Sequence, residues 1–267
     1  MKGVSEQLFR VYWKMERAIV PGLRHAQRQY ERVIESFVRP SIRWLDLGCG
    51  RRVLSPWRWE SERALVSRTD MLFGVDSDLE SLRDNQTISL RCQARADALP
   101  FRSGAFDLVT ANMVFEHLQG PECEMAEVWR LLVDGGVMLL HTPNRWAFPT
   151  IFLQPVPQAL KHVAAAALEG RSKKDVFPAY YRINSASAIR NIAARCGFDV
   201  VSIQLVVTGA LFALVPPLAA LELLFIRLIS APWAAAARPN IIAVLRKRGR
   251  RTDIPGSAVP AGAGACA

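Results

Sequence analysis

The chain has 267 residues, of which 51% are hydrophobic and 22% charged, and this composition excludes a protein that is disordered over most of its length. A chain of this size can bury one hydrophobic core, so we expect a single domain with at most one appendage. Its five cysteines form no CxxC pair, which argues against a disulfide scaffold or a zinc module and favours a reducing compartment. No uninterrupted apolar run marks a secretory signal, so the sequence predicts a cytoplasmic protein.

The net charge of +10 is distributed unevenly along the chain. Residues 1–70 carry 14 basic and 8 acidic side chains, residues 71–141 carry 5 and 11, and residues 142–267 carry 15 and 5. The acidic middle, without a basic stripe that interleaves aromatic residues, argues against a nucleic-acid partner. A basic and apolar last third instead favours contact with an anionic membrane surface.

Amphipathic helices open the chain, because apolar residues recur at helical spacing over 4–19 and again over 23–37. We interpret residues 1–40 as an N-terminal helical lid. Apolar strands and helices then alternate, which predicts a doubly wound α/β sheet with right-handed crossovers. The glycine pair Gly135 and Gly136 is expected to cap the end of the helix 121–132. The expected strands are 42–47, 71–76, 91–96, 106–111, 137–141, 198–207 and 241–245, and the other expected helices are 60–66, 79–85 and 185–196.

Glycines and an aspartate follow the first two expected strands. In an open α/β sheet, ligands bind at the carboxyl ends of the strands. Gly48 and Gly50 allow a ligand to approach the backbone closely, and a helix N-terminus after them offers free N–H groups. Asp76 follows the second strand, where a carboxylate suits both hydroxyls of a ribose. These residues predict a site for a ligand that contains a ribose.

The third and fourth strands add residues that suit an adenine ring. Asp97 and Ala98 stand where they would hold the adenine amine, and Asn112 follows the fourth strand. The dinucleotide fingerprint G-x-G-x-x-G is broken by Val53, and no G-K-[ST] of a P-loop occurs. A glycine turn without a pyrophosphate cradle fits an adenosine whose 5′ substituent is not a phosphate.

Several short motifs occur in a fixed order over residues 44–144. Together they resemble the class I S-adenosylmethionine-dependent methyltransferases, in particular the small-molecule type called type 11. Weaker matches at 181–184 and 194–198 extend the resemblance toward the last strand. The motifs are Leu45-Asp-Leu-Gly-Cys-Gly50, Gly74-Val-Asp76, Asp97-Ala-Leu-Pro-Phe101, Phe106-Asp-Leu-Val109, Glu116-His-Leu118, and Val133-Asp-Gly-Gly136 with His141-Thr-Pro-Asn144.

The resemblance implies a Rossmann-like, seven-stranded sheet over residues 41–248, mostly parallel with an antiparallel last strand. It also implies S-adenosylmethionine as the cofactor. The family usually has a third glycine where this chain has Arg52, which is a departure from its pattern. The implied cofactor contacts are Asp46, Gly48 and Gly50 at the methionine moiety, Asp76 at the ribose, Asp97 and Ala98 at the adenine, and Asn112 beside the methyl group and sulfur.

Methyl transfer from a sulfonium depends mainly on alignment of the acceptor with the methyl carbon. A hydroxyl acceptor also benefits from a base, and His117 and His141 are the candidates at strand ends, with a structural or orienting role as the alternative for each. Some similar quinone-pathway O-methyltransferases bind a divalent metal through a Glu-His pair and an acidic residue three positions before the Glu. In this chain that position is Met113, so no metal site is expected.

The expected function is methyl transfer to a small-molecule, lipid-linked or glycan acceptor. Tyr30, Phe177, Tyr180 and Tyr181 are candidates for lining the acceptor pocket. The alternative is an inactive, methyltransferase-like protein that serves as a membrane-associated binding or scaffold protein. A nucleotide-sugar or NAD enzyme is disfavoured because Val53 breaks the dinucleotide fingerprint.

Residues 208–238 form an apolar insertion between the last two strands, charged only at Glu222, Arg227 and Arg238. Two membrane crossings need about 40 residues, and a single crossing would separate the last strand from its sheet. We therefore expect a helical protrusion that leaves and returns on one side. Its expected role is peripheral contact with the inner face of the membrane, supported by the basic cluster 246–251, and a lid or a dimer contact are the alternatives. The tail 249–267 is expected to be disordered.

Overall fold

The computed structural model describes residues 2–148, 150–153 and 178–249. The expected disordered tail, apart from its first residue, and the candidate Phe177 lie outside these residues. Seven strands form one sheet in the order β3-β2-β1-β4-β5-β7-β6. The strands are β1 (Arg43–Leu47), β2 (Met71–Asp76), β3 (Leu90–Gln93), β4 (Phe106–Asn112), β5 (Leu132–Pro143), β6 (Phe198–Val206) and β7 (Asn240–Lys247).

Strands β1 to β5 pair in parallel, and β7 runs antiparallel between β5 and β6. This arrangement confirms the expected Rossmann-like sheet, with its antiparallel last strand. The strand order reverses between β1 and β4, which is the point where open α/β sheets bind ligands. Strands β1 and β4 are almost wholly buried, because helices cover both faces of the sheet.

Each face of the sheet has its own helical layer and hydrophobic core. Helices α2 (Ala26–Phe37), α3 (Trp59–Val66) and α4 (Leu79–Asp84) cover one face, and their apolar stripes include the fully buried Tyr30 and Ile34. Helices α5 (Pro121–Leu131) and α8 (Ala186–Arg195) cover the other face. The Ser185 hydroxyl caps α8 by accepting a hydrogen bond from the Ala188 N–H. The short elements are η1 (Pro56–Arg58), η2 (Phe115–His117), α6 (Thr150–Leu153) and η4 (Pro232–Ala237).

The expected C-cap at Gly135 and Gly136 is wrong. Helix α5 ends at Leu131, β5 begins at the next residue, and both glycines lie inside that strand. The pairing of β4 with β5 shifts its register at this point, and Gly135 has a φ of 77°. A bulge needs such a conformation, and glycine adopts it without a steric penalty. The glycines therefore bend a strand rather than end a helix.

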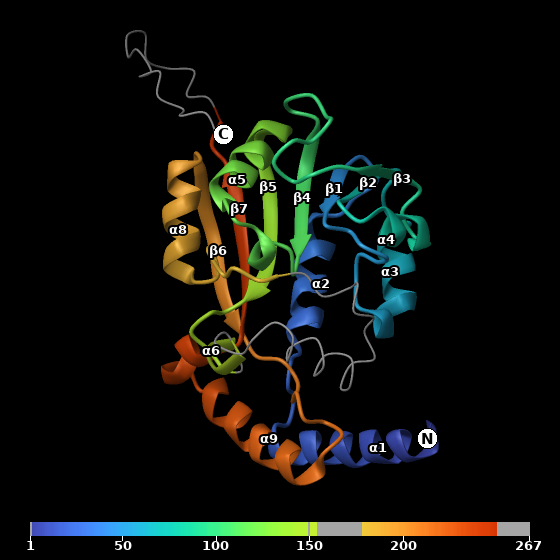
Figure 1. Ribbon diagram of the computed structural model, residues 1–267, viewed down its shortest axis with the longest axis vertical. Helices are drawn as coiled ribbons and strands as arrows, with labels where there is room; N and C mark the ends of the chain where they lie inside the picture. The colour runs from blue at the N-terminus through green and yellow to red at the C-terminus, as the bar shows by residue number, and fades with distance from the viewer. Residues whose placement is uncertain (1, 149, 154–177, 250–267) are drawn as a thin grey trace.

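Helices α1 (Lys2–Ile19) and α9 (Pro216–Ser230) pack together beyond the carboxyl ends of the parallel strands (Figure 1). Pro216 and Pro217 occupy the first turn of α9, where the missing N–H groups are not needed, so the prolines begin the helix. Tyr12 of α1 and Leu223 of α9 belong to the small core that joins the two helices. The insertion 208–238 thus leaves and re-enters the sheet at one edge. No helix in the described part of the chain has the length and apolar character to span a membrane.

Candidate active site

A cleft of about 920 Å³ opens where the carboxyl ends of β1, β2 and β4 meet. Five of the residues predicted from the sequence line it: Gly48, Gly50, Asp76, Asp97 and His117. Gly48 and Gly50 follow β1, Asp76 ends β2, Asp97 follows β3 and His117 follows β4, so four parallel strands contribute to the cleft. The sheet therefore gathers most of the expected cofactor residues around one opening.

The glycine turn after β1 closes tightly against the sheet. The Gly48 and Cys49 N–H groups both donate to the Val75 carbonyl, at 2.7 and 3.0 Å. Gly48 and Gly50 have φ values of 68° and 45°, which favour glycine. A Cβ on Gly48 would also collide with the Val114 side chain. The turn consequently presents bare backbone to the cleft, as a closely bound ligand requires.

Asp76 fixes this turn and still faces the cleft. Its Oδ2 accepts a hydrogen bond from the Gly50 N–H at 2.8 Å, and its Oδ1 accepts one from the Asp78 N–H at 2.9 Å. Each carboxylate oxygen keeps a second lone pair for another donor. Asp78 in turn caps α4 by accepting from the Glu80 and Ser81 N–H groups. Asp76 is thus oriented and able to accept from ligand hydroxyls.

Asp97 also lines the cleft and is paired with Arg95. The Arg95 guanidinium donates to both Asp97 oxygens, at 2.9 and 2.6 Å, and this pairing holds the pKa of Asp97 below its usual value. Asp97 is therefore ionised at neutral pH. The Ala98 N–H donates to the Arg95 carbonyl at 3.2 Å, so Ala98 closes the turn that carries the aspartate.

Asp46 lies in the buried strand β1, beneath the glycine turn. Thr110 Oγ1 donates to Asp46 Oδ1 at 2.5 Å and accepts from Trp44 Nε1 at 2.7 Å. Burial raises the pKa of Asp46 to about 8. The hydrogen bond of this carboxyl therefore joins β1 to β4.

Asn112, which is half-buried, and the buried His141 form a pair near the ends of β4 and β5. His141 Nδ1 donates to Asn112 Oδ1 at 2.8 Å, and Gln27 of α2 reaches the same amide at 3.3 to 3.4 Å. His141 is 0% exposed, and burial lowers its pKa to about 3, so the ring is neutral at physiological pH. Tyr30, a candidate for the acceptor pocket, is also 0% exposed and stacks on this ring at 5.2 Å between centroids.

Glu116 is a titratable cleft residue that the sequence analysis named only as part of a motif. It is 5% exposed, lines the cleft from η2, and accepts from Thr142 Oγ1 at 3.0 Å. Burial raises its pKa to about 7. The Thr142 hydroxyl also accepts from Asn184 Nδ2 at 2.6 Å, so its proton is directed at Glu116. A carboxyl that titrates near neutral pH in a cleft is a characteristic of acid–base sites.

His117 neighbours this carboxylate and is held by a distant loop. Its Nδ1 faces the Pro178 carbonyl at 2.8 Å and must donate there, and its Nε2 lies 3.9 Å from Glu116 Oε1. The Tyr180 and Tyr181 N–H groups both donate to the Glu116 carbonyl, at 2.6 and 3.2 Å. Of the aromatic candidates for the acceptor pocket, Tyr180 lines the cleft. The Glu-His motif alone could not show this arrangement, because its partners lie far along the chain.

The charge of the cleft suits a cationic ligand better than a phosphate. Acidic side chains outnumber the two basic ones, Arg51 and Arg95. Arg52, the departure from the family's third glycine, stacks its guanidinium on the Trp59 ring at 4.6 Å. The sulfonium and amine of S-adenosylmethionine carry positive charge, so this lining fits that cofactor. The acidic lining residues are Asp76, Asp78, Asp97, Glu116 and Glu124.

Fold and cleft together define a class I S-adenosylmethionine-dependent methyltransferase. Residues 23–203 match the family model described as a methyltransferase domain, which is more than half of the chain. The chain therefore belongs to this methyltransferase domain family, and S-adenosylmethionine is its cofactor.

Curated relatives share the central part of the chain. A ubiquinone biosynthesis O-methyltransferase of Chromobacterium violaceum is 30% identical over 109 residues, covering 38% of this chain and 44% of that enzyme. A malonyl-[acyl-carrier protein] O-methyltransferase of Enterobacter lignolyticus is 30% identical over 104 residues, covering 39% and 40%. The chain thus matches less than half the length of each enzyme.

Solved structures resemble nearly the whole chain in fold. An S-adenosylmethionine-dependent methyltransferase from Mesorhizobium loti is 17% identical with a TM-score of 0.54, over 83% of this chain and 98% of that one. The [4+2]-cyclase SpnF is 14% identical with a TM-score of 0.54, over 91% and 94%. These likenesses show the fold alone, and the acceptor has to be argued from the site.

Proposed function

We propose that the protein transfers the methyl group of S-adenosylmethionine to a hydroxyl oxygen of a small-molecule acceptor, with Glu116 as the general base. The observation that carries the proposal is the buried Glu116 carboxyl in the cleft, whose pKa is raised to about 7. A hydroxyl must lose its proton as its oxygen is methylated, and a base works best when its pKa lies near the working pH. The names of the two curated relatives as O-methyltransferases support an oxygen acceptor.

When bound, S-adenosylmethionine supplies an activated methyl group on a sulfonium. We assign Gly48 and Gly50 to the methionine end, because their backbone is bare. Asp76 accepts the ribose hydroxyls through its remaining lone pairs, and Asp97 with Ala98 flanks the adenine. The acidic lining favours the positively charged cofactor, and the enzyme's main task is to align the acceptor oxygen.

Within this proposal the two histidines have different roles. His117 lines the cleft beside Glu116 and is the second candidate for the base. His141 is buried, so we assign it to orienting Asn112, which the family resemblance places beside the methyl group. Asp46 supports the glycine turn from below through its place at the end of β1.

Metal independence is the first expected result. Met113 stands where similar metal-dependent enzymes have an acidic residue, and the described residues contain no group of three or more His, Cys, Asp or Glu that could hold a metal ion. We expect the rate of methyl transfer to be unchanged by EDTA. If EDTA abolishes turnover and magnesium restores it, Glu116 is not a general base that acts without a metal ion.

We also propose peripheral contact with anionic lipid at the cytoplasmic face of a membrane, which extends the acceptor class to lipid-linked molecules and glycans. One face of α9 is apolar and exposed, and Trp233 of η4, which follows, is 76% exposed. Arg227 of α9 and three exposed basic residues of the neighbouring helix α1 complement an anionic surface. The apolar face consists of Leu218, Leu221, Leu224 and Leu228, which are 44 to 65% exposed, and the basic residues of α1 are Arg10, Lys14 and Arg17.

Flotation with liposomes tests this contact. We expect the protein to float with anionic liposomes, and the double variant Leu221→Ser and Leu224→Ser to float much less, because both side chains leave the lipid. Leu90→Ser on the edge strand β3, where Leu90 is 43% exposed, is the matched control and should float normally. If the unaltered protein is folded and monomeric but stays at the bottom of the gradient, the proposed contact with anionic lipid is wrong.

The exposed apolar face also supports the second candidate function, an inactive methyltransferase-like protein that binds or scaffolds partners at a membrane. Calorimetric titration with S-adenosylmethionine separates the two candidates, because an enzyme must bind the cofactor. We expect binding of one cofactor per chain, whereas a chain without cofactor affinity would favour the scaffold.

A further inference from the structure

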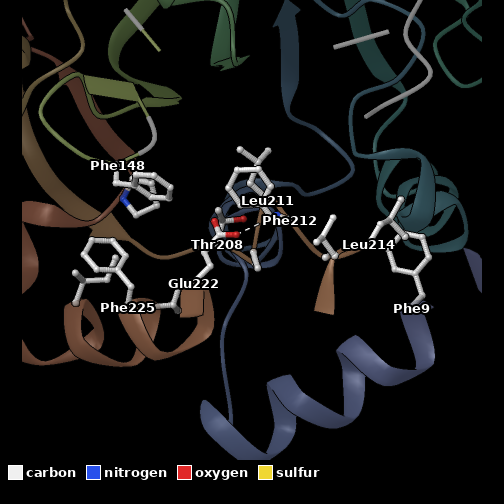
Figure 2. A pocket seen from close by; sticks show the side chains of 15 residues that line it. Phe9, Phe148, Thr208, Leu211, Phe212, Leu214, Glu222 and Phe225 are labelled. Carbon is white, nitrogen blue, oxygen red and sulfur yellow. Dashed lines mark hydrogen bonds between the residues drawn. The ribbon is translucent and has the colours of Figure 1, made fainter. Parts of the chain in front are cut away.

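A second pocket, of about 380 Å³, lies between α9, α1 and the segment that follows β6. Figure 2 shows its labelled side chains spread from Phe148 and Phe225 at one side to Leu214 and Phe9 at the other. The rings of Phe148 and Phe225 meet edge to face at 5.6 Å. Aromatic rings therefore lie at both sides of the labelled lining.

The lining of this pocket, hereafter the α9 pocket, is almost entirely hydrocarbon. Its polar side chains are Thr208 and Glu222, and the Glu222 carboxylate already accepts the Phe212 N–H at 3.0 Å (Figure 2). A sugar, a nucleoside or a phosphate would leave its polar groups without partners there. A hydrocarbon chain would bind there favourably, because its transfer from water into the pocket buries apolar surface without leaving polar groups unpaired.

The α9 pocket opens at the same edge of the sheet as the cofactor cleft. Phe148 follows β5, Thr208 follows β6, and Pro239 precedes the antiparallel β7, so all three lie at the carboxyl ends of the parallel strands. Hydrogen bonds join the pocket wall to α1, and the next helix, α2, to the end of β4. The Ala210 N–H donates to Tyr12 of α1 at 3.0 Å, and Gln27 of α2 contacts Asn112 at the end of β4.

The exposed apolar surface beside the α9 pocket indicates that a hydrocarbon chain would enter from a membrane. Leu211 and Val215 at the pocket are 38% and 41% exposed, and they precede the exposed leucines on the outer face of α9. Helix α9 and its neighbour α1 also carry exposed basic residues, which complement anionic lipid. The pocket thus adjoins the surface on which a molecule from a membrane would arrive.

We infer that the α9 pocket binds the aliphatic tail of the methyl acceptor, while the acceptor's hydroxyl-bearing head enters the cofactor cleft. This inference rests on the proposed function and names its substrate class, a hydroxylated molecule with one long hydrocarbon chain. A polar acceptor without such a tail would leave the α9 pocket unused.

Calorimetric titration with octanol, decanol and dodecanol tests tail binding without cofactor or acceptor. We expect saturable binding that strengthens by up to about fourfold for each added CH₂ group, the gain expected for full burial. Ala213→Trp places a large ring in the pocket and should weaken decanol binding at least roughly tenfold, because the space for several CH₂ groups is lost. Phe225→Ser, which removes an aromatic wall, should weaken it as well.

Controls separate this inference from the proposed function. Leu221→Ser, on the outer face of α9, and Glu116→Gln should bind decanol like the unaltered protein, and Ala213→Trp should bind S-adenosylmethionine normally. The inference is overturned if decanol binds no better than octanol, or if both pocket variants fold and bind decanol with unchanged affinity. It is also overturned if Ala213→Trp no longer floats with anionic liposomes, since the pocket would then hold the tail of a bilayer lipid. If Glu116→Gln loses methyl transfer but binds decanol normally, the inference about the α9 pocket still holds.

Discussion

Replacing Glu116 by glutamine is expected to lower kcat by about a hundredfold to ten-thousandfold, the usual contribution of a general base. The amide cannot take the acceptor's proton, yet it retains the shape of the side chain and an oxygen that accepts from Thr142. The affinity for S-adenosylmethionine should stay unchanged, because the carboxyl acts on the acceptor. Transfer of a labelled methyl group, with cofactor affinity measured by calorimetry, checks both parts.

The pH dependence of the rate identifies the base. Glu116 must be ionised to accept a proton, so activity should rise with pH and level off above its pKa of about 7. Thr142→Val removes a hydrogen bond to the carboxylate that lowers this pKa, so the midpoint should move to higher pH. Thr142→Ser keeps the hydroxyl and is the control that should restore the midpoint. An active Glu116→Gln together with an inactive His117→Gln would instead make His117 the base.

Replacing Asp76 by alanine is expected to weaken S-adenosylmethionine binding by about 1–3 kcal/mol, which is about 5-fold to 150-fold in Kd. The ribose hydroxyls lose a charged acceptor, and the Gly50 and Asp78 N–H groups lose theirs. Asp76→Asn keeps one side-chain oxygen, so its affinity for S-adenosylmethionine should lie between those of Asp76→Ala and the unaltered protein.

The matched control is Asp199→Ala, on the edge strand β6. Asp199 pairs with Arg248 at the surface and its side chain is 61% exposed, so its loss should leave cofactor affinity unchanged. Equal affinity for cofactor in Asp76→Ala and in the unaltered protein would remove the ribose assignment.

The sheet was predictable because its strands are short apolar runs that alternate with helical stripes. Most strand boundaries in the structure fall within a few residues of those expected, for example β2 at Met71–Asp76, but β5 begins at Leu132, five residues before the expected start. Gly135 misled the prediction, because a glycine pair after a helix indicates a cap as readily as a bulge. Pro216 lies in the first turn of α9, where proline is favoured, so a proline in an apolar run can begin a helix.

The cleft was only partly predictable. Gly48, Gly50 and Asp76 follow strands directly, so their place at the carboxyl edge follows from topology alone. Glu116 was read as half of a motif, because its burial depends on packing that no local pattern reveals. Its partner Thr142 lies on β5, and Asn184, which orients Thr142, lies just before α8.

The burial of individual side chains also could not be predicted from the sequence. His141 ends an apolar strand, and the same position can face a cleft or a neighbouring helix. Here α2 places Tyr30 on the ring and buries it. The packing of an N-terminal helix against the far end of the sheet is a tertiary contact that periodicity cannot predict.

Transfer of a labelled methyl group from S-adenosylmethionine into cell extract tests the account most directly. The extract is divided into lipid and water-soluble fractions, and the Glu116→Gln variant serves as the blank. We predict a labelled methyl ether in the lipid fraction with the unaltered protein, formed faster above neutral pH and absent with the variant. Cofactor binding without labelled product in any fraction would contradict the account and favour an inactive binding protein.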